Sequence, residues 1–393
     1  MITLNQAIDI ILSETKLSAK TEKIPLWNSL GRVLAEDIIS DMNMPPFDKT
    51  AVDGYACRMI DARKELEVIE IISAGSVPKK AIGVGQCSKI MTGAMIPKGA
   101  DCVLMVEDTV EVAKDRIRFN GDKPKSNICI LGEDIKTGDL AIPRGTTISN
   151  QHIAIMAALG CSQPVVTQKP SVAVLITGDE LVEPEIMPQG GQIRNSNGHQ
   201  LVTQVISANA EPNYFGIIKD TEDDTYRALS EALSKNDIVI LTGGVSMGDY
   251  DYVPMVMQKL GIQILFDSIA IQPGKPTKFG VKNGKLIFGL PGNPVSSYMQ
   301  FEILVKPAIQ KIMGAKTSTE FIARLPMSTN FSRKKVERQG LIPVAITNDK
   351  KVIPVEFHGS AHIFALAKAD GYIMIPLGVA EIKEGELVDV RPL

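Results

Sequence analysis

The segment DIVILTGGVSMGDYDY (residues 237–252) decides how this chain is interpreted, because an apolar run stops abruptly at a pair of glycines. Residues 238–241 are apolar on both sides of an extended strand, which is typical of a strand buried within a parallel sheet. The loop that follows carries three glycines and two aspartates, at Gly243, Gly244, Gly248, Asp249 and Asp251. Because ligands of open α/β sheets bind beyond the carboxyl ends of the strands, this loop is predicted to belong to a binding site.

Apolar runs and helical runs alternate on both sides of that segment. Further strands are predicted at residues 172–177, 213–219, 264–271 and 286–290. Helices are predicted between them, at residues 197–210, 221–235 and 252–261, and from Val295 onward with a kink at Pro307. This alternation predicts an α/β domain over residues 170–316, with a parallel sheet covered by helices on both faces.

The pattern changes before and after this region. A helix begins at a capping box of Thr3 and Gln6, and a second helical run is predicted around residues 30–39. Short β-type runs separated by Gly, Pro and Asp follow, and then a helix with Asn150 as its N-cap and Gly160 as its end. Short strands return after the α/β region and predict a small barrel or sandwich.

Composition excludes several classes of protein. A chain of 393 residues is expected to form about two to four domains. A net charge of -3 gives no overall basic field for nucleic acid or anionic lipid, so neither is expected as a partner. The five cysteines include no CxxC pair and favour a reducing compartment. Without a signal-peptide pattern or an apolar run of ~20 residues, we expect a cytoplasmic protein rather than a membrane protein.

The predicted strand ends carry complementary chemistry. Acidic side chains follow two other strands, at Asp179, Glu180 and Asp220. After the strand at 286–290, the sequence LPGNPVSS places Asn293 at a helix cap, Pro294 at the first helical position and Ser296 in the first turn. Free N–H groups at such a loop bind anions, and carboxylates nearby would repel the anion unless a hard cation lay between them. We therefore expect a phosphate bridged by Mg²⁺ rather than an acid/base dyad.

Each of these features alone is more simply explained by local structure. A glycine pair after a strand is usually a tight turn, PGNP can be helix capping only, and a single aspartate is often an N-cap. Their convergence on one sheet edge is what favours a ligand site.

Three other motifs are weaker candidates. His358 and His362 have the spacing of a zinc motif, but HGSAH contains Gly and Ser within a β-rich tail and is interpreted as a loop. GVGQCS lacks dinucleotide-binding spacing and a following helix. The basic run at 333–338 has no interleaved aromatic residues and is interpreted as a solvated surface.

Seven motifs in order carry a resemblance to a known family. They are PPFDKTAVDGYA (45–56), IMTGAMIP (90–97), GEDI (132–135), TGDEL (177–181), GGVSMGDYD (243–251), QPGKP (272–276) and GLPGNPVSS (289–297). Together they resemble the molybdopterin molybdenumtransferases, the family that includes bacterial MoeA and the C-terminal domain of gephyrin. The resemblance extends from about residue 3 to the C-terminus.

The resemblance implies a multidomain α/β plus β protein. The implied regions are an elongated segment of residues 1–40 and 141–169, an inserted β-rich domain of 41–140, the α/β domain of 170–316 and a C-terminal β-barrel of 317–393. It implies a homodimer whose active site is shared between subunits. The implied reaction uses Mg²⁺ and converts adenylylated molybdopterin and molybdate into molybdenum cofactor and AMP, with a molybdopterin adenylyltransferase as donor of the substrate.

The resemblance also assigns roles by position. The implied catalytic residues are Asp53, Asp134, Glu180, Asp251 and Lys275. The implied substrate-binding residues are Thr92, Asp220, Gly243, Gly244, Ser246, Gly248, Pro291, Gly292, Asn293, Pro294, Ser296 and Ser360. The implied metal ligands are Glu180, Asp220 and Asp251. The chain departs from the family pattern at Cys129 and Gln272, where basic residues are usual, and Arg144, Arg194 or the run at 333–338 can compensate.

Two other functions stay open at this point. A scaffold or binding protein could retain the same fold, although it would not need these carboxylates. A nucleotide pyrophosphatase with a similar α/β domain would need neither the first 170 residues nor the C-terminal β region. Molybdate and tungstate are nearly isosteric, so the sequence does not separate a molybdate enzyme from a tungstate-inserting paralogue.

Overall fold

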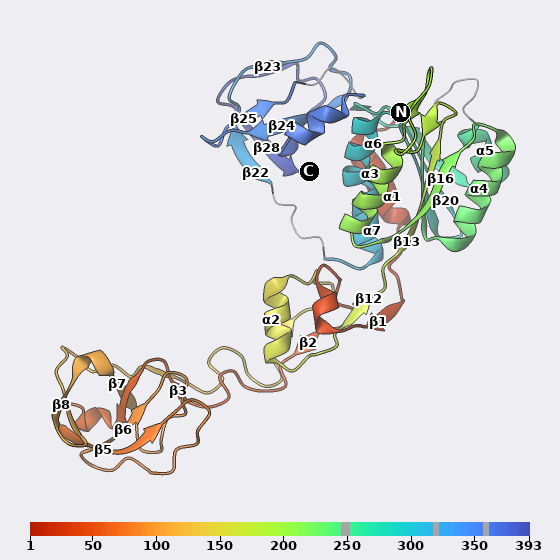
Figure 1. The fold of residues 1–393 in the computed structure, drawn as a ribbon. Coiled ribbons are helices and arrows are strands. Elements are labelled where there is room, and N and C mark those ends of the chain that lie inside the picture. Colours follow the sequence, from red (N-terminus) through yellow and green to blue (C-terminus); the bar gives the residue numbers. More distant parts are fainter. Residues whose placement is uncertain (245–251, 317–321, 357–360) are drawn as a thin grey trace.

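The computed structural model describes residues 1–244, 252–316, 322–356 and 361–393. Figure 1 shows an elongated molecule with a β sheet at one end and an α/β sheet at the other, beside which the C-terminal strands lie. A narrow segment that carries α2 (Asn150–Ala158) connects the two ends. Within the described ranges, no helix is both long and apolar enough to cross a membrane.

The α/β sheet has six strands in the order β16-β13-β17-β21-β20-β18. Their bounds are Ser171–Thr177 (β13), Glu211–Ile218 (β16), Ile238–Thr242 (β17), Gln263–Ser268 (β18), Pro276–Lys282 (β20) and Lys285–Leu290 (β21). The first four in this order are parallel, as predicted, whereas β20 runs antiparallel to both of its neighbours, β21 and β18. The strand β20 was not predicted from the sequence. A two-residue turn joins it to β21. Asn283 and Gly284 both have positive φ (51° and 78°), the conformation that a tight hairpin requires.

The strands are buried on both faces because each side of the sheet has its own core. Val172, Val174 and Ile176 of β13 point to one core, and Ala173 and Leu175 point to the other. The first core is completed by α1 (Leu4–Glu14), α3 (Asn197–Ser207), α6 (Pro294–Gln300) and α7 (Lys306–Ile312). The second is completed by α4 (Glu222–Lys235) and α5 (Val253–Lys259). The predicted covering of both faces is confirmed (Figure 1).

The long C-terminal helix of this region is interrupted before its proline. The α-helical turns of α6 give way to a π-helical segment, Phe301–Val305, and resume in α7. Pro307 has no N–H to donate to the preceding turn, so the irregularity lies next to the predicted kink.

The strand order reverses between β13 and β17. The chain leaves β13 through α3 to β16 on one side, and then returns through α4 to β17 on the other side of β13. The helices that follow β13 and β17 in the chain, α3 and α5, therefore cover opposite faces of the sheet. A reversal of this kind leaves a crevice at the carboxyl ends of the two strands, where open α/β sheets bind their ligands.

The connecting segment consists of two short antiparallel pairs and α2. The pairs are β1 (Thr21–Lys23) with β12 (Val165–Thr167), and β2 (Ile38–Ile39) with β11 (Leu140–Ile142). The helix predicted around residues 30–39 is absent: Gly31 has a φ of 74°, and Val33 and Leu34 form β-bridges instead. Their apolar side chains are buried by sheet partners, which overrides helical spacing. The helix α2 begins as predicted, but its N-cap is Ser149, in a capping box with His152, rather than Asn150.

The outer sheet has the strand order β7-β4-β6-β5-β9-β8. Its strands are Gly54–Cys57 (β4), Glu65–Ile72 (β5), Gln86–Ile90 (β6), Cys102–Met105 (β7), Thr109–Ala113 (β8) and Arg116–Phe119 (β9). A short pair, β3 (Lys49–Thr50) with β10 (Ile128–Cys129), accompanies it. Alternate residues of β4 face separate apolar clusters, so this sheet also has two covered faces.

The C-terminal strands form a sheet that curls back on itself. Its order is β19-β24-β26-β28-β22, with β25 beside β24. The bounds are Ile271–Gln272 (β19), Ala323–Pro326 (β22), Gln339–Ile346 (β24), Val352–Pro354 (β25), Gly371–Ile375 (β26) and Leu387–Pro392 (β28). Met327, directly after β22, bridges Val352 of β25, so the two edges meet. The basic run at 333–338 is not wholly a solvated surface, because Arg333 donates hydrogen bonds to the carbonyl groups of Pro376, Arg338 and Val379.

Candidate functional site

A cleft of about 520 Å³ lies at the carboxyl ends of β13 and β17, where the strand order reverses. Thr177 and Thr242 end the two strands and form its floor. The walls are contributed by Glu180, Gly243, Gly244, Pro276, Ala361, residues 193–197 and residues 291–294. Six of the residues that the sequence assigned to substrate binding therefore line one cleft, together with Glu180. These six are Gly243, Gly244, Pro291, Gly292, Asn293 and Pro294.

The two glycines after β17 are required by their surroundings. Gly243 and Gly244 have φ values of 89° and 59°, which side chains rarely adopt. A Cβ on Gly243 would overlap the carbonyl oxygen of Thr177, and one on Gly244 would lie 2.9 Å from the Thr177 hydroxyl. The absence of side chains lets the ends of β13 and β17 approach each other and leaves the loop backbone open to a ligand.

Asn197 ties three parts of the cleft together. Its Nδ2 donates to the Thr242 hydroxyl (3.2 Å) and to the carbonyl of Gly292 (2.8 Å). Asn197 is 8% exposed, yet its Oδ1 has no hydrogen-bond partner in the described part of the chain. Buried polar oxygens are nearly always satisfied, so unpaired ones in a cleft indicate a ligand or water.

Sequence reasoning missed Asn195 and Asn197. The signal was present in RNSNG (194–198), where polar residues directly precede a helical run. Asn195 is 1% exposed, and its Nδ2 donates to the hydroxyl of Tyr214 (2.7 Å), which in turn donates to Glu183 (2.7 Å). This chain of bonds holds the loop that forms one wall of the cleft.

Arg194 and Glu180 line the cleft, and the carboxylates of Asp179 and Asp220 lie near Glu180. Arg194 donates from Nε to the carbonyl of Pro184 (3.0 Å). Asp179 and Asp220 each accept a hydrogen bond from the other's backbone N–H, at 3.2 and 3.3 Å. Burial raises the pKa of Asp220, and the charges of Asp179 and Glu180 raise it further. Crowded carboxylates that repel one another are the oxygen donors that suit Mg²⁺.

The resemblance predicts a metal site at Glu180, Asp220 and Asp251. No group of three His, Cys, Asp or Glu side chains with metal-binding spacing occurs among the described residues. Asp251 lies outside them, as do Ser246, Gly248 and Ser360, and likewise Asp249 and His358.

The loop after β19 brings a further cation near the cleft. Pro276 lines the cleft, and the preceding Lys275 has an exposed side chain. Ser296 is buried at 1% exposure and does not line the cleft. Its Cβ would lie 3.2 Å from a Cβ on Gly274, so Ser296 packs against the loop that carries Lys275.

Asp53 and Thr92 lie together, but in the outer sheet. The Thr92 backbone N–H and hydroxyl both donate to Oδ1 of Asp53, at 2.6 and 2.8 Å. These bonds lower the pKa of Asp53. Asp134 is exposed and lies in a turn. Its backbone N–H donates to the carbonyl of Met44 (3.0 Å). Figure 1 shows the outer sheet at the opposite end of the molecule, so one chain does not bring Asp53 and Thr92 to the cleft.

Three family models match successive parts of the chain. They are the MoeA N-terminal region (domain I and II) over residues 2–160, the probable molybdopterin binding domain over 173–311, and the MoeA C-terminal region (domain IV) over 324–393. A Staphylococcus epidermidis protein named molybdopterin molybdenumtransferase is 38% identical over 99% of this chain and 95% of its own length. A Staphylococcus aureus protein of the same name is 36% identical with the same coverage. The chain belongs to the MoeA family.

The solved structures agree with this assignment. The molybdopterin biosynthesis MoeA protein of Pyrococcus horikoshii OT3 superposes with a TM-score of 0.87 and 32% identity, over 100% of both chains. The resemblance and the fold class predicted from the motifs are therefore confirmed. The relatives are named molybdopterin molybdenumtransferase, which is the name of an enzyme. The chain therefore belongs to an enzyme family of molybdenum cofactor biosynthesis.

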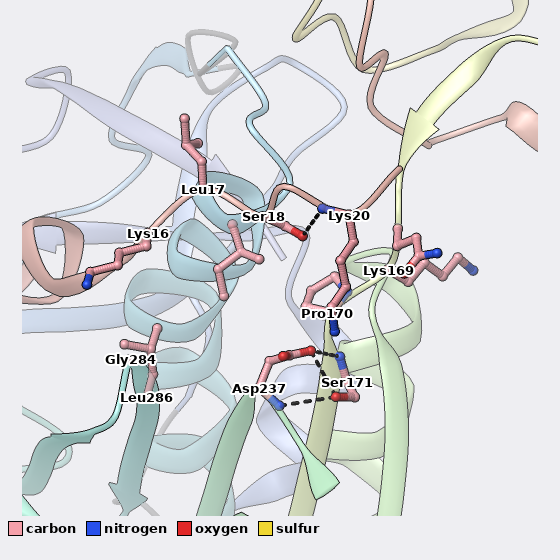
Figure 2. A pocket seen from close by; sticks show the side chains of 12 residues that line it. Lys16, Leu17, Ser18, Lys20, Lys169, Pro170, Ser171, Asp237, Gly284 and Leu286 are labelled. Atoms are coloured by element: carbon pink, nitrogen blue, oxygen red, sulfur yellow. Dashed lines mark hydrogen bonds between the residues drawn. The ribbon is translucent and has the colours of Figure 1, made fainter. Parts of the chain in front are cut away.

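This member of the MoeA family also has a pocket of about 290 Å³ at the opposite ends of the strands. Figure 2 shows Lys20 above Ser171 and Asp237, with the side chain of Lys169 directed away. Asp237 accepts from both the N–H and the hydroxyl of Ser171, each at 2.9 Å. These bonds join the starts of β13 and β17. We therefore interpret the Asp237 carboxylate as part of the sheet structure and not as part of a ligand site.

Proposed function

We propose that this chain transfers molybdenum from molybdate to adenylylated molybdopterin and releases AMP, in a reaction that requires Mg²⁺. Support comes from the names of its relatives and from the chemistry of the cleft at the ends of β13 and β17. The observation that carries the proposal is the glycine pair, Gly243 and Gly244, in the same cleft as the buried Asn197 Oδ1, which has no partner in the described residues. Pterin and phosphate groups offer the donors and acceptors that such a surface binds.

The glycine loop and the acidic residues have separate roles in this proposal. The backbone N–H groups of Gly243 and Gly244, with residues 291–294, contact the phosphates. Glu180, Asp220 and Asp251 would hold Mg²⁺. When bound, the ion supplies positive charge that offsets the pyrophosphate during cleavage of its anhydride. Ser246, Gly248 and Ser360 are proposed to contact the substrate.

Two cations orient the anionic substrates. Lys275 is proposed to bind molybdate or phosphate, and Arg194 supplies a second charge at the cleft wall. Arg194 thus compensates for the neutral Gln272 at a position where the family is usually basic. Holding the pterin dithiolene near molybdate lowers the barrier by bringing the reactants together in the correct orientation.

The active site is proposed to be shared within a homodimer. Asp53 and Thr92 of the partner subunit would then complete the cleft together with Asp134 of the partner subunit. Support comes from the exposed apolar side chains of Trp27, Leu30 and Ile155 in the connecting segment, which are 87%, 53% and 39% exposed. Large exposed apolar residues on neighbouring elements are typical of an interface.

The remaining expectations belong to the same proposal. The domains are proposed to divide at 1–40 with 141–169, 41–140, 170–316 and 317–393. The substrate is proposed to come from a molybdopterin adenylyltransferase in the cytoplasm. A scaffold without activity is the less favoured alternative, because it would not need the acidic residues Asp179, Glu180 and Asp220 beside one cleft.

The test is AMP release from adenylylated molybdopterin in the presence of molybdate and Mg²⁺. The wild type is expected to release AMP, and Glu180→Gln and Asp53→Asn are expected to lose most of that activity. Asp115→Asn, at an exposed turn of the outer sheet, is the matched control and should be unaffected. A wild type without AMP release would reject the function, and full activity of Asp53→Asn would reject the role of that carboxylate.

A further inference from the structure

We propose that Gln300 is a positioning residue for Lys275: it fixes the peptide that precedes Lys275 and so directs the lysine side chain. The inference rests on the proposed function, in which Lys275 binds the anionic substrate. Gln300 ends α6, the helix that follows the 291–294 wall of the cleft, and has no exposed surface (0%). A buried amide on this helix has to find hydrogen-bond partners, and it finds them in the Lys275 loop.

Both polar atoms of the Gln300 amide are used. Nε2 donates to the carbonyl oxygen of Gly274 at 2.6 Å. The Thr277 hydroxyl lies 2.8 Å from Oε1 and 2.9 Å from the Gly274 carbonyl, so its one proton is shared between two acceptors of the same clamp. A carbonyl can only accept, so Nε2 has to face Gly274 and the orientation of the amide is determined. Gln300 therefore clamps the loop on both sides of Lys275.

The backbone of Lys275 is held through both of its peptide groups. The carbonyl of Gly274 belongs to the peptide before Lys275 and is bound by Gln300. The carbonyl of Lys275 belongs to the next peptide and accepts from the N–H of Ile269 at 3.0 Å. Fixing both peptides fixes the direction in which Cβ leaves the chain. The side chain is exposed and makes no ion pair within the described ranges, so its charge is available to a ligand.

Gly274 has the geometry that this contact requires. Its φ is 100°, and a Cβ at this position would overlap Nε2 of Gln300. Only glycine lets the loop approach the amide so closely. The helix widens into the π-helical segment Phe301–Val305 directly after Gln300, an irregularity that is frequent at functional sites.

The variant Gln300→Met tests the proposal, because methionine has a similar shape but neither donates nor accepts strongly. Gln204→Met is the matched control. Gln204 is 6% exposed and its Nε2 donates to Tyr298 O (3.3 Å) and Glu302 (2.8 Å), on the same helical segment but without contact to the Lys275 loop. The two variants should lose similar thermal stability. Only Gln300→Met should speed hydrogen exchange in residues 272–277 and weaken molybdate binding measured by calorimetry.

Measurements of AMP release allow a double-mutant cycle that combines Gln300→Met with Lys275→Met. We expect Gln300→Met to lower AMP release by roughly 10- to 100-fold, the range typical of a misplaced group. In the Lys275→Met background it should cause almost no further loss, because the lysine through which it acts is gone. Gly274→Ala perturbs the same contact from the side of the loop and should show the same pattern of losses. It replaces Gln300→Met in the test if that variant does not fold.

Equal losses with and without Lys275 would overturn the proposal, as would hydrogen exchange in 272–277 no faster than in Gln204→Met. If the wild type itself releases no AMP, the proposed function fails. The exchange measurement still decides whether Gln300 holds the loop.

Discussion

Thr92 donates two hydrogen bonds to a single oxygen of Asp53, one from its backbone N–H and one from its hydroxyl. The two residues are 39 positions apart and meet because β4 and β6 pair in the outer sheet. Gly54 pairs with Ile90 in that ladder, so the residues just beyond the strand ends come together. The arrangement holds one carboxylate oxygen and leaves the other available to a substrate or metal.

The first prediction concerns the titration of Asp53. The backbone bond from Thr92, and then its hydroxyl bond, hold the pKa of Asp53 below the ordinary value of 3.8. A carboxylate with a lowered pKa stabilises the folded state above its ordinary pKa, and this stabilisation is lost as pH falls through the folded value. Thr92→Val removes only the hydroxyl bond and should raise the pKa of Asp53 part of the way back to 3.8. Carbon-detected NMR measures this pKa. Thr109→Val, which loses a bond to Val106 O, is the control and should leave Asp53 unchanged.

The second prediction tests whether the active site is shared. Asp53→Asn and Glu180→Gln should each be nearly inactive alone. Mixed and allowed to exchange subunits, they should recover about a quarter of wild-type activity, because half of the dimers are mixed and each has one intact site of two. If both residues acted within one subunit, the mixture would stay inactive.

The third prediction tests the proposed dimer interface. Trp27 is 87% exposed, and Trp27→Asp should shift the protein toward monomers in sedimentation velocity because it places a charge in an apolar contact. Ile60→Asp alters another exposed apolar residue, which is 75% exposed in the 3-10 turn Met59–Asp61 after β4, and should leave the proposed dimer intact. An unchanged dimer in Trp27→Asp would mean that the interface lies elsewhere.

The fourth prediction compares two glycines of the cleft. Gly243→Ala should destabilise the protein by about 2 kcal/mol or more, because its φ is positive and the new Cβ overlaps Thr177. Gly292→Ala places a Cβ 3.6 Å from Gly243, an ordinary contact, and should cost much less. Urea denaturation of both variants checks the difference, and equal midpoints would contradict it.

The fifth prediction concerns the thiols. Cys57, Cys87 and Cys102 are buried next to one another across three paired strands, whereas Cys129 and Cys161 are half-buried. Burial raises the pKa of Cys87 to about 12, and the hydrogen bond with Cys102 together with burial raises the pKa of Cys57. Because three of the five thiols are buried, a chromogenic disulfide reagent at neutral pH should label the two half-buried thiols first and the other three only in denaturant. Rapid labelling of all five would show that the outer sheet opens readily.

The predictions from sequence succeeded where a pattern was local and repeated. The apolar runs of β13, β16, β17 and β21 identified the parallel strands, and the capping box of Thr3 and Gln6 marked the first helix. The prediction of a helix around residues 30–39 was wrong, because Val33 and Leu34 form β-bridges with the distant residues Thr147 and Val166. The strand β20 was missed because its pairing depends on the Asn283–Gly284 turn.

The site shows the same difference between features that local patterns predict and features that depend on long-range contacts. By itself the sequence determined the family, the alternation of strands and helices, and the glycine and acidic residues at the strand ends. All of these depend on residue type and short spacing along the chain. Only the tertiary structure decided that Asn197 joins Thr242 to Gly292, that Gln300 binds the Lys275 loop, and that Asp53 lies far from the cleft of its own chain. These relationships depend on hydrogen-bond partners and strand crossings that no local pattern specifies, since each one joins segments that only the packed sheet brings together.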